Sequence, residues 1–211
     1  MRVIKPYYEI EEIPDGAYVL QKLEKCARTC YKSEDKITPY SAAAFLQKLL
    51  SHDPPHMSVI EHGCITVRIV CDRGVTHELV RHRLVSYSQE STRYCNYSKG
   101  KFDGEITLIR PFFFPDDSEE YEVWRKACFA AEGAYMQLLK LGAKPQEARS
   151  VLPNSLKTEI VVTANLRQWG HIFKQRTAAG AHPQMREVMV PLLEDVRSRI
   201  SVLYDNLNVY C

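Results

Sequence analysis

The segment between Asp116 and Gly142 most constrains what the chain can fold into, because it carries the start, the body and the end of one long helix. Acidic residues crowd its first turn, where carboxylates interact favourably with the helix dipole. Lys140 lies near its end, and Gly142 stands where a C-terminal cap belongs. The sequence therefore predicts a continuous helix over residues 116–142.

Around this helix the sequence predicts further helices and few strands. Residues 64–70 alternate apolar and polar side chains, which is the period of a half-buried strand. Residues 2–13 alternate more loosely, and residues 105–115 predict a strand with a proline interruption. The run SYSQEST, residues 86–92, is rich in small hydroxyl side chains and predicts a loop. Shorter helices are expected over residues 16–33, 38–55, 75–85, 145–153 and 165–177.

The final predicted helix carries a single apolar stripe at helical spacing. The stripe consists of Met185, Met189, Leu192, Val196, Ile200 and Leu203. Pro191 lies within the same helix and is expected to kink or divide it, because proline removes a backbone donor. The stripe could pack against the same chain or against another subunit, and we expect it to belong to the chain's own core.

Length and composition favour one globular domain. The chain has 211 residues, of which 45% are apolar and 26% are charged, as is ordinary for a globular protein. With the patterns above, these values predict a single helix-rich α+β domain over residues 1–211 with a modest, mostly antiparallel sheet. The formal net charge is only +2 and basic residues cluster locally, which argues against a general nucleic-acid coat protein.

The sequence also predicts where the protein resides. Its first residues lack the uninterrupted apolar stretch of a secretory signal, and no apolar run approaches the roughly 20 residues that span a bilayer. Seven cysteines, an odd number, are scattered from Cys26 to Cys211 and do not form the pattern of a disulfide framework. We therefore expect a reduced, cytoplasmic protein with neither a membrane nor a nucleic acid as partner.

The run RHRLVSYSQESTR, from Arg81 to Arg93, combines arginines and hydroxyl side chains with a single carboxylate, Glu90. Guanidinium groups bind phosphate through paired hydrogen bonds, and hydroxyls supply neutral donors, so this combination suits a phosphorylated small molecule. On a helix over residues 75–85, Glu78, Arg81 and His82 would share a face and Arg83 would point elsewhere. Two directions suggest two anionic groups, or one on each side of an interface. The alternative is a solvated basic face beside an incidental serine-rich turn.

Individual residues also suggest other chemistries. Histidines at positions 52, 56, 62, 77 and 82 invite a metal site, but no HExxH motif occurs and a double proline separates two of them, so no metal is expected. Cys95 lies near Arg93, whose charge could lower the pKa of its thiol and make it a nucleophile; the alternative is an inert, packed thiol. A nucleotide- or RNA-binding module without chemistry also remains open. Neither GxGxxG nor GxxxxGKS occurs, so any nucleotide cofactor must be held without a Rossmann or P-loop motif.

The arginine-rich segment resembles the signature of the flavin-dependent thymidylate synthases. That signature reads arginine, histidine, arginine and then a serine eight residues later, a spacing met by Arg83 and Ser91. Further segments match the other blocks of the family in order, and together they cover most of residues 56–190. These segments are HMSVIEH (56–62), EARSVLP (147–153), TANLRQWGHIFKQR (163–176) and AHPQ (181–184).

The resemblance implies a fold, an assembly and a reaction. The implied fold is a single α+β domain that assembles as a homotetramer, with FAD bound between subunits. The implied reaction converts dUMP to dTMP with methylenetetrahydrofolate as one-carbon donor and NADPH as reductant, through FAD. No protein nucleophile is expected.

The resemblance also implies the residues of each site. The implied flavin site comprises Ser58, Arg81, His82, Arg83, Gln89, Asn165, Arg167 and His171. The implied dUMP site comprises Glu78, Arg81, Gln89, Glu90, Ser91, Thr92, Arg93, Arg149 and Arg176, with His56 near the folate. Arg176 is expected to be the catalytic residue, because its charge would stabilise negative charge at the N3/O2 edge of uracil. The chain departs from the family pattern at Gln89, where a carboxylate is usual, at Glu78 and at His171.

Overall fold

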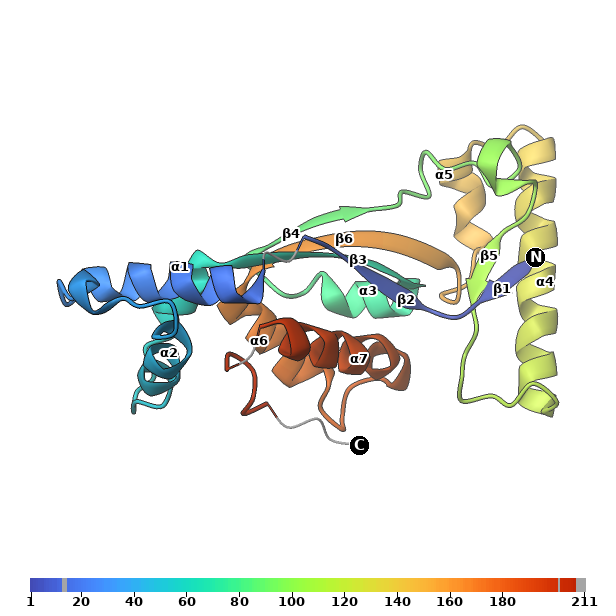
Figure 1. The fold of residues 1–211 in the computed structure, drawn as a ribbon. Coiled ribbons are helices and arrows are strands. Elements are labelled where there is room, and N and C mark those ends of the chain that lie inside the picture. The colour runs from blue at the N-terminus through green and yellow to red at the C-terminus, as the bar shows by residue number, and fades with distance from the viewer. Residues whose placement is uncertain (13–14, 201, 208–211) are drawn as a thin grey trace. The chain divides into compact units, whose positions relative to one another are not determined.

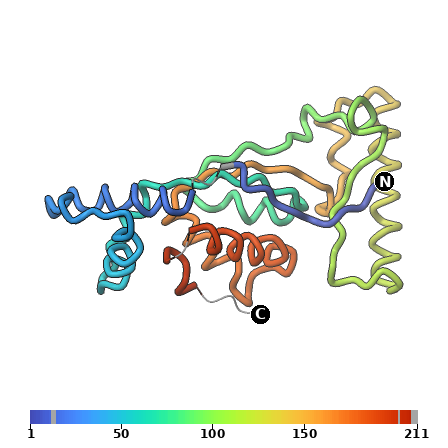
Figure 2. The backbone as a smooth tube through the Cα atoms, viewed as in Figure 1, coloured from blue at the N-terminus to red at the C-terminus, as the bar shows by residue number. Residues whose placement is uncertain are grey.

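The computed structural model describes residues 1–12, 15–200 and 202–207 (Figures 1 and 2). The described chain divides into two compact units, and each is built from separate stretches of sequence. Unit 1 consists of Met1–Tyr7, Ile69–Arg81 and Ser88–Ile160. Unit 2 consists of the described residues of Tyr8–Arg68, His82–Tyr87 and Val161–Cys211.

The chain has the helix-rich α+β class that the sequence predicts, with an antiparallel sheet of four strands. Its order is β2-β3-β6-β4, and the strands run Tyr7–Glu12 (β2), Cys64–Asp72 (β3), Lys157–Asn165 (β6) and Val85–Gln89 (β4). A separate pair, β1 (Arg2–Ile4) and β5 (Thr107–Ile109), is parallel, with Val3 opposite Leu108.

Several predicted strand boundaries were wrong. The N-terminal strand is divided into β1 and β2 at Lys5-Pro6, because proline cannot donate to a strand partner. The strand expected over residues 105–115 is limited to β5. The loop expected over residues 86–92 begins as strand β4, since pairing with β6 continues to the Glu90 N–H, which donates to the Glu159 carbonyl over 2.8 Å. Strand β6 itself was not predicted.

Unit 1 contains the long helix α4, which runs from Glu119 to Lys140 and confirms the prediction from the acidic first turn. The Ser118 side chain caps its start by accepting from the Tyr121 N–H over 3.1 Å. Gly142 follows its end at a φ of 96°, a conformation that favours glycine. The helix expected over residues 145–153 is the short α5 (Pro145–Ala148) followed by a 3₁₀ turn, η4 (Arg149–Val151).

Helix α3 of unit 1 runs from Arg73 to Leu79, shorter than the predicted 75–85. The Asp72 carboxylate accepts from the Val75 N–H over 2.8 Å and fixes its start. No glycine or proline marks its end in the sequence, and the chain turns instead through Leu84 at a φ of 59°. Residues 81–83 therefore lie outside the helix, and the shared face expected for Glu78, Arg81 and His82 was wrong.

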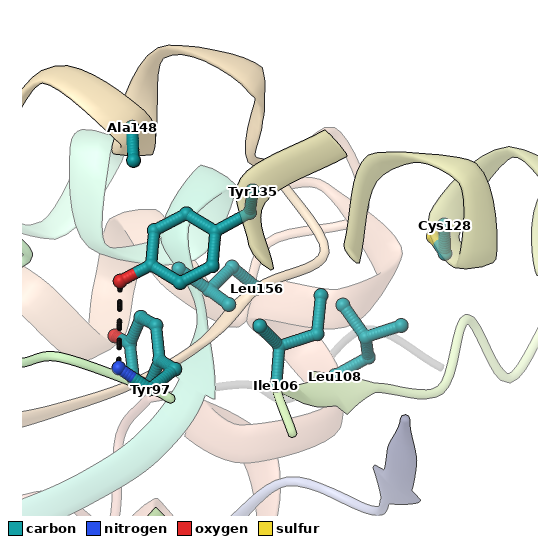
Figure 3. Close-up of a cluster of buried hydrophobic side chains, with 7 residues drawn as sticks. All are labelled: Tyr97, Ile106, Leu108, Cys128, Tyr135, Ala148 and Leu156. Carbon is teal, nitrogen blue, oxygen red and sulfur yellow. Dashed lines mark hydrogen bonds between the residues drawn. The ribbon is translucent and has the colours of Figure 1, made fainter. Parts of the chain in front are cut away.

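The core of unit 1 packs around α4 and β5. Figure 3 shows its cluster of buried side chains: Tyr97, Ile106, Leu108, Cys128, Tyr135, Ala148 and Leu156. The Tyr135 hydroxyl accepts from the Tyr97 N–H over 3.4 Å, so a buried polar group within this cluster is satisfied. This core supports the segment that follows β4.

Unit 2 contains α1 (Gly16–Thr29), α2 (Ala42–Leu50), α6 (Leu166–Arg176) and α7 (Pro183–Arg199), with the 3₁₀ helices η1 (Glu34–Lys36) and η2 (Met57–His62). Helices α1, α2 and α6 lie within their predicted ranges but are shorter, and the two 3₁₀ helices were not predicted. Helices α6 and α7 lie side by side (Figures 1 and 2). The indole N–H of Trp169 on α6 donates to the Ile65 carbonyl of β3 over 3.0 Å, and Trp169 is fully buried.

The stripe on α7 is buried within this chain, which confirms the expectation that it belongs to the chain's own core. Met185, Met189, Leu192 and Val196 are fully buried, and so is Ile200 directly after the helix. Leu203 lies beyond the helix and is half-buried. Helix α7 runs through Pro191 without division, because buried side chains on both sides of the proline offset the missing hydrogen bond. Within the described ranges no helix is both long and apolar enough to cross a membrane.

Candidate functional site

The end of strand β4 carries the first residue of the predicted nucleotide site, Gln89. Its side-chain Nε2 donates to the hydroxyl of Thr76 on α3 over 3.0 Å and to the hydroxyl of Thr158 on β6 over 3.2 Å. Both threonines are fully buried, whereas Gln89 is half-buried. Two neighbouring elements of unit 1 therefore fix the amide of Gln89.

The next residue, Glu90, is held by a cation and a phenol. Its carboxylate accepts from Lys157 Nζ over 2.7 Å and from the Tyr97 hydroxyl over 2.9 Å. The side chain of Glu90 is 12% exposed and that of Lys157 is 20% exposed, so little water screens the pair. Beside Glu90, the pKa of Tyr97 is raised, first by burial and then by the carboxylate, which keeps the phenol protonated as a donor.

Ser91 to Cys95 form a tight turn. The Ser91 carbonyl accepts from the N–H groups of Tyr94 and Cys95, and the Ser91 hydroxyl accepts from the Arg93 N–H over 3.3 Å. Thr92 is 4% exposed, and its hydroxyl accepts from Arg149 Nη1 over 3.2 Å. Thr92 thus joins the predicted nucleotide-binding loop to an arginine more than fifty residues away in sequence.

Two exposed guanidinium groups of unit 1 belong to this turn or contact it. Arg93 is exposed, with its guanidinium carbon 5.6 Å from the centre of the Tyr94 ring. Arg149 is also exposed, although Thr92 restrains it. Arg81, just beyond α3, is exposed as well, and Glu78 on α3 is half-buried. Exposed guanidinium groups suit the grip of a phosphate better than a role in the core.

The structure does not support a reactive Cys95. Its pKa is raised, first by burial and then by the negative charge of Glu90, and these effects outweigh the nearby lysines. Of the two alternatives for Cys95, the inert, packed thiol is the one favoured, because burial and then the Glu90 carboxylate outweigh the neighbouring cations. A thiol with a raised pKa is a poor nucleophile near neutral pH.

In unit 2, Arg176 at the end of α6 contacts His82. Its Nε donates to Nε2 of His82 over 2.9 Å, across 94 positions of sequence. His82 is buried, and burial, followed by the charges of Arg176 and His171, lowers its pKa to about 4. The imidazole is therefore neutral near pH 7 and accepts a hydrogen bond without cancelling the guanidinium charge.

Two more side chains complete the surroundings of His82. The ring of His171, which lies on α6 as Arg176 does, is edge-on to the His82 ring, with ring centres 5.6 Å apart. The Tyr87 hydroxyl donates to the His82 carbonyl over 3.2 Å. Burial raises the pKa of Tyr87 to about 12, so this phenol also remains protonated. The middle residue of the RHR signature is thus a structural centre of unit 2.

The other predicted flavin residues of unit 2 lie on or next to α6 and η2. Asn165 caps α6, with its side-chain oxygen accepting from the Gln168 N–H over 2.8 Å. Arg167 contacts Glu61 over 2.6 Å in an exposed pair. Ser58 lies within η2 and is exposed, and Arg83 is exposed too. Hydroxyl, amide and guanidinium donors of this kind fit a diphosphate-containing cofactor.

His56 directly precedes η2 and is exposed. Its ring lies edge-on to His52 with centres 5.1 Å apart. Across the described part of the chain, no group of three or more histidine, cysteine, aspartate or glutamate side chains is arranged to hold a metal ion.

The two predicted sites separate by unit with three exceptions. Every predicted flavin residue lies in unit 2 except Arg81 and Gln89, and every predicted dUMP residue lies in unit 1 except Arg176. Within unit 1 the structure joins Thr92 to Arg149 directly, and within unit 2 it joins Arg176, His82 and His171.

Sequence reasoning missed the residues that hold these side chains in place. They are Thr76, Thr158, Lys157 and Tyr97. A signal for one of them was present, because Thr158 shares the alternate positions of residues 157–165 with Ile160 and Val162, and all three are buried. Nothing in the sequence indicates the partners of the other three.

Comparisons with known proteins show the family of this chain. Residues 18–200 match the family model described as thymidylate synthase complementing protein. The flavin-dependent thymidylate synthase of Pyrococcus abyssi is 37% identical over 169 residues, which are 80% of this chain and 68% of the relative. That of Corynebacterium aurimucosum is 33% identical over 217 residues, covering 94% of this chain and 84% of the relative.

Solved structures share the fold. Thymidylate synthase X from Helicobacter pylori, crystallised with FAD and dUMP, has a TM-score of 0.76 at 19% identity, over 96% of this chain and 98% of that one. The UMP/dUMP methylase PolB from Streptomyces cacaoi, bound with 5-Br dUMP, has a TM-score of 0.76 at 22% identity, over 97% and 96%. The chain thus shares the fold of these two proteins over nearly its whole length. The chain belongs to the flavin-dependent thymidylate synthases, a family of methyltransferases.

Proposed function

We propose that this chain converts dUMP to dTMP, with methylenetetrahydrofolate as one-carbon donor, NADPH as reductant and FAD as bound cofactor. The observation that carries the proposal is the contact between Arg176 and His82, because it holds a charged guanidinium on a neutral acceptor. Membership of the family and the unbroken RHR signature support it.

Arg176 is the proposed catalytic residue. Uracil C5 must become nucleophilic, and a positive charge at the N3/O2 edge favours the electron distribution that this requires. A charge held in place before reaction is worth a few kcal/mol, on the order of 3, in a transition state. His82 contributes by orienting the guanidinium, and since its pKa is about 4 it does not add a competing positive charge near pH 7.

The loop Gln89–Arg93 and Arg149 are the proposed dUMP-binding residues, together with Glu78 and Arg81. Arg93 and Arg149 have exposed guanidinium groups of the kind that bind phosphate bidentately. Ser91 anchors the substrate through its hydroxyl or through the N–H groups of its turn. Glu90, already bonded to Lys157 and Tyr97, acts by shaping the loop.

FAD, when bound, supplies the hydride-transfer chemistry that the protein's side chains lack. Its proposed hydrogen-bond donors in unit 2 are Ser58, Arg83, Arg167 and His171. The other proposed flavin-binding residues are Arg81, His82 and Gln89. Asn165 uses its side-chain oxygen to cap α6, which leaves its amide N–H groups as the part that binds a ligand. His56 is the proposed contact near the folate.

We further propose that residues 1–211 act as one catalytic domain, that four copies assemble into a homotetramer which shares its sites, and that the enzyme works in the cytoplasm. The family resemblance supports each of these proposals. The cysteine route is the rival chemistry, and the raised pKa of Cys95 argues against it.

The test is an anaerobic incubation of the purified protein with dUMP, methylenetetrahydrofolate, FAD and NADPH, followed by chromatography of dTMP. A control omits FAD and NADPH. Product only in the complete mixture supports the proposal. Product in the control indicates the cysteine route with folate as its own reductant, and no product in either mixture reduces the proposal to nucleotide binding.

A further inference from the structure

The hydroxyl of Thr76 determines which way the side-chain amide of Gln89 is oriented. This hydroxyl donates to the Arg73 carbonyl over 3.0 Å, which uses its single proton. Toward Gln89 it can therefore only accept, and it must face the N–H side of the amide, 3.0 Å away. The reversed amide would set two acceptors against each other in a fully buried place.

Thr158 uses the second N–H of the same amide. Its hydroxyl lies 3.2 Å from Nε2 of Gln89 and is fully buried on β6. Both donors of the amide are thus consumed inside unit 1. The side-chain oxygen Oε1 remains, and no described residue donates to it. The side chain accordingly presents an acceptor and no donor to any ligand.

We propose that Thr76 and Thr158 are positioning residues that make Gln89 a neutral hydrogen-bond acceptor for a donor group of the nucleotide, an inference that rests on the proposed function. An acceptor cannot pair with phosphate oxygens or with the uracil carbonyls. The group recognised is therefore the sugar hydroxyl or the ring N3–H.

The same geometry favours an amide at position 89, where the family resemblance implies a carboxylate. A carboxylate has no N–H to give to Thr76, whose proton is held by the Arg73 carbonyl. At Thr76 the carboxylate would therefore face a buried oxygen that has no proton to give it, and a charge placed against an acceptor is costly. The two threonines and Gln89 thus form one unit of recognition.

The first test compares two substitutions of Thr158 in the FAD-loaded protein by calorimetry with dUMP. Thr158→Val keeps the shape of the side chain but removes the hydroxyl that accepts from Gln89, so the Kd for dUMP should rise about five- to tenfold. In separate steady-state kinetics, kcat at saturating dUMP should stay within about twofold. Thr158→Ser should bind as the wild type does. Thr163→Val is the matched control, because Thr163 lies on the same strand with its hydroxyl 3.0 Å from that of Thr66. Wild-type binding by Thr158→Val, or equal losses in the serine and valine variants, overturns the proposal.

A double-mutant cycle asks whether Thr158 acts through Gln89. In a Gln89→Leu background, Thr158→Val should cause no further loss of dUMP affinity, because its effect has already been removed. Additive losses would show that Thr158 acts by another route and would overturn the proposal.

Two analogues identify the donor: 2′,3′-dideoxyuridine monophosphate lacks the sugar hydroxyl, and N3-methyl-dUMP lacks the ring N–H. The analogue without the recognised donor should bind more weakly than dUMP to the wild type and equally to Gln89→Leu. Losses that are the same in both proteins for both analogues exclude Gln89 as the acceptor.

Failure of the proposed function would be visible separately, as a wild type that binds no dUMP. In that case, proton exchange of the Gln89 side-chain amide still tests the threonines, by NMR on the ligand-free protein. Exchange should be slow in the wild type and faster in Thr158→Val. Equal exchange overturns the positioning role.

Discussion

Nε of Arg176 lies 2.9 Å from Nε2 of His82, so a guanidinium takes its hydrogen-bond acceptor from the middle residue of the RHR signature. The imidazole is buried and neutral near pH 7, since its pKa is about 4. The signature histidine therefore has a function of its own in unit 2: it aims the residue that we propose to be catalytic.

Replacement of His82 should lower kcat more than it changes KM for dUMP. His82→Leu removes the acceptor and should reduce kcat about tenfold or more, in line with the loss of an oriented charge. His82→Gln retains an acceptor oxygen and should lose less. Steady-state kinetics of both variants measure the difference, and equal kcat values would show that the contact does not orient Arg176.

His82 should also make stability depend on pH. Its pKa is lowered from 6.5 to about 4 in the folded chain, mainly by burial, so the unfolded chain binds this proton more readily. The contribution of neutral His82 is thus complete above about pH 6.5 and is lost as the pH falls toward 4. Urea midpoints at about pH 7.5 and pH 5 should differ less in His82→Gln than in the wild type. If the two midpoints differ as much in His82→Gln as in the wild type, other groups cause the acid sensitivity.

The pair of Lys157 and Glu90 should matter for substrate affinity. Lys157→Met leaves a carboxylate that is 12% exposed without its cation, and the loop that carries it must rearrange. We expect KM for dUMP to rise about tenfold, as loss of a partly buried charge pair of a few kcal/mol allows. The double variant Glu90→Gln with Lys157→Met should recover part of the loss. Lys126→Met, on the exposed face of α4, is the control, and an equal effect there would refute a specific role.

Cys95→Ala should retain activity within about twofold. Burial and Glu90 raise the pKa of this thiol, so it is a weak nucleophile. Alkylation by iodoacetamide should be slow at neutral pH for the same reason, as mass spectrometry of the modified peptide can show. An inactive alanine variant that remains folded would favour the cysteine route.

Two glycines should respond to alanine in opposite ways. A Cβ at Gly16 would lie 1.7 Å from the Arg199 carbonyl oxygen, so Gly16→Ala should destabilise the chain by about 2–4 kcal/mol through backbone displacement. A Cβ at Gly133, within α4, would meet nothing within 4 Å. Gly133→Ala should therefore stabilise by about 1 kcal/mol, the difference in helix propensity. Denaturant midpoints measure both shifts, and shifts of the same sign would contradict the packing at Gly16.

The sequence predicted the elements whose signals are local. The acidic first turn and Gly142 predict helix α4, and the alternation of apolar and polar residues predicts strand β3. Strand β4 was not predicted in this way, because Val85 and Tyr87 alternate with serines over only five residues, and the strand is completed by pairing with β6. Its sequence favours a loop, and a long-range partner overrides that preference.

In the candidate site, too, local sequence signals predict less than long-range contacts determine. Resemblance indicates which residue types belong to each site, but Arg176 meets His82 across 94 positions and Lys157 meets Glu90 across 67. Such partners depend on how strands and helices are brought together. Local pattern therefore could not predict that His82 is buried while Arg81 and Arg83 on either side of it are exposed.

The chain passes between its two units after Tyr7, Arg68, Arg81, Tyr87 and Ile160. Dividing the gene at a single point therefore cannot separate one unit from the other, and neither unit corresponds to one continuous segment that could be transferred to another protein. A truncation at either end of the chain therefore cannot remove one unit and leave the other whole.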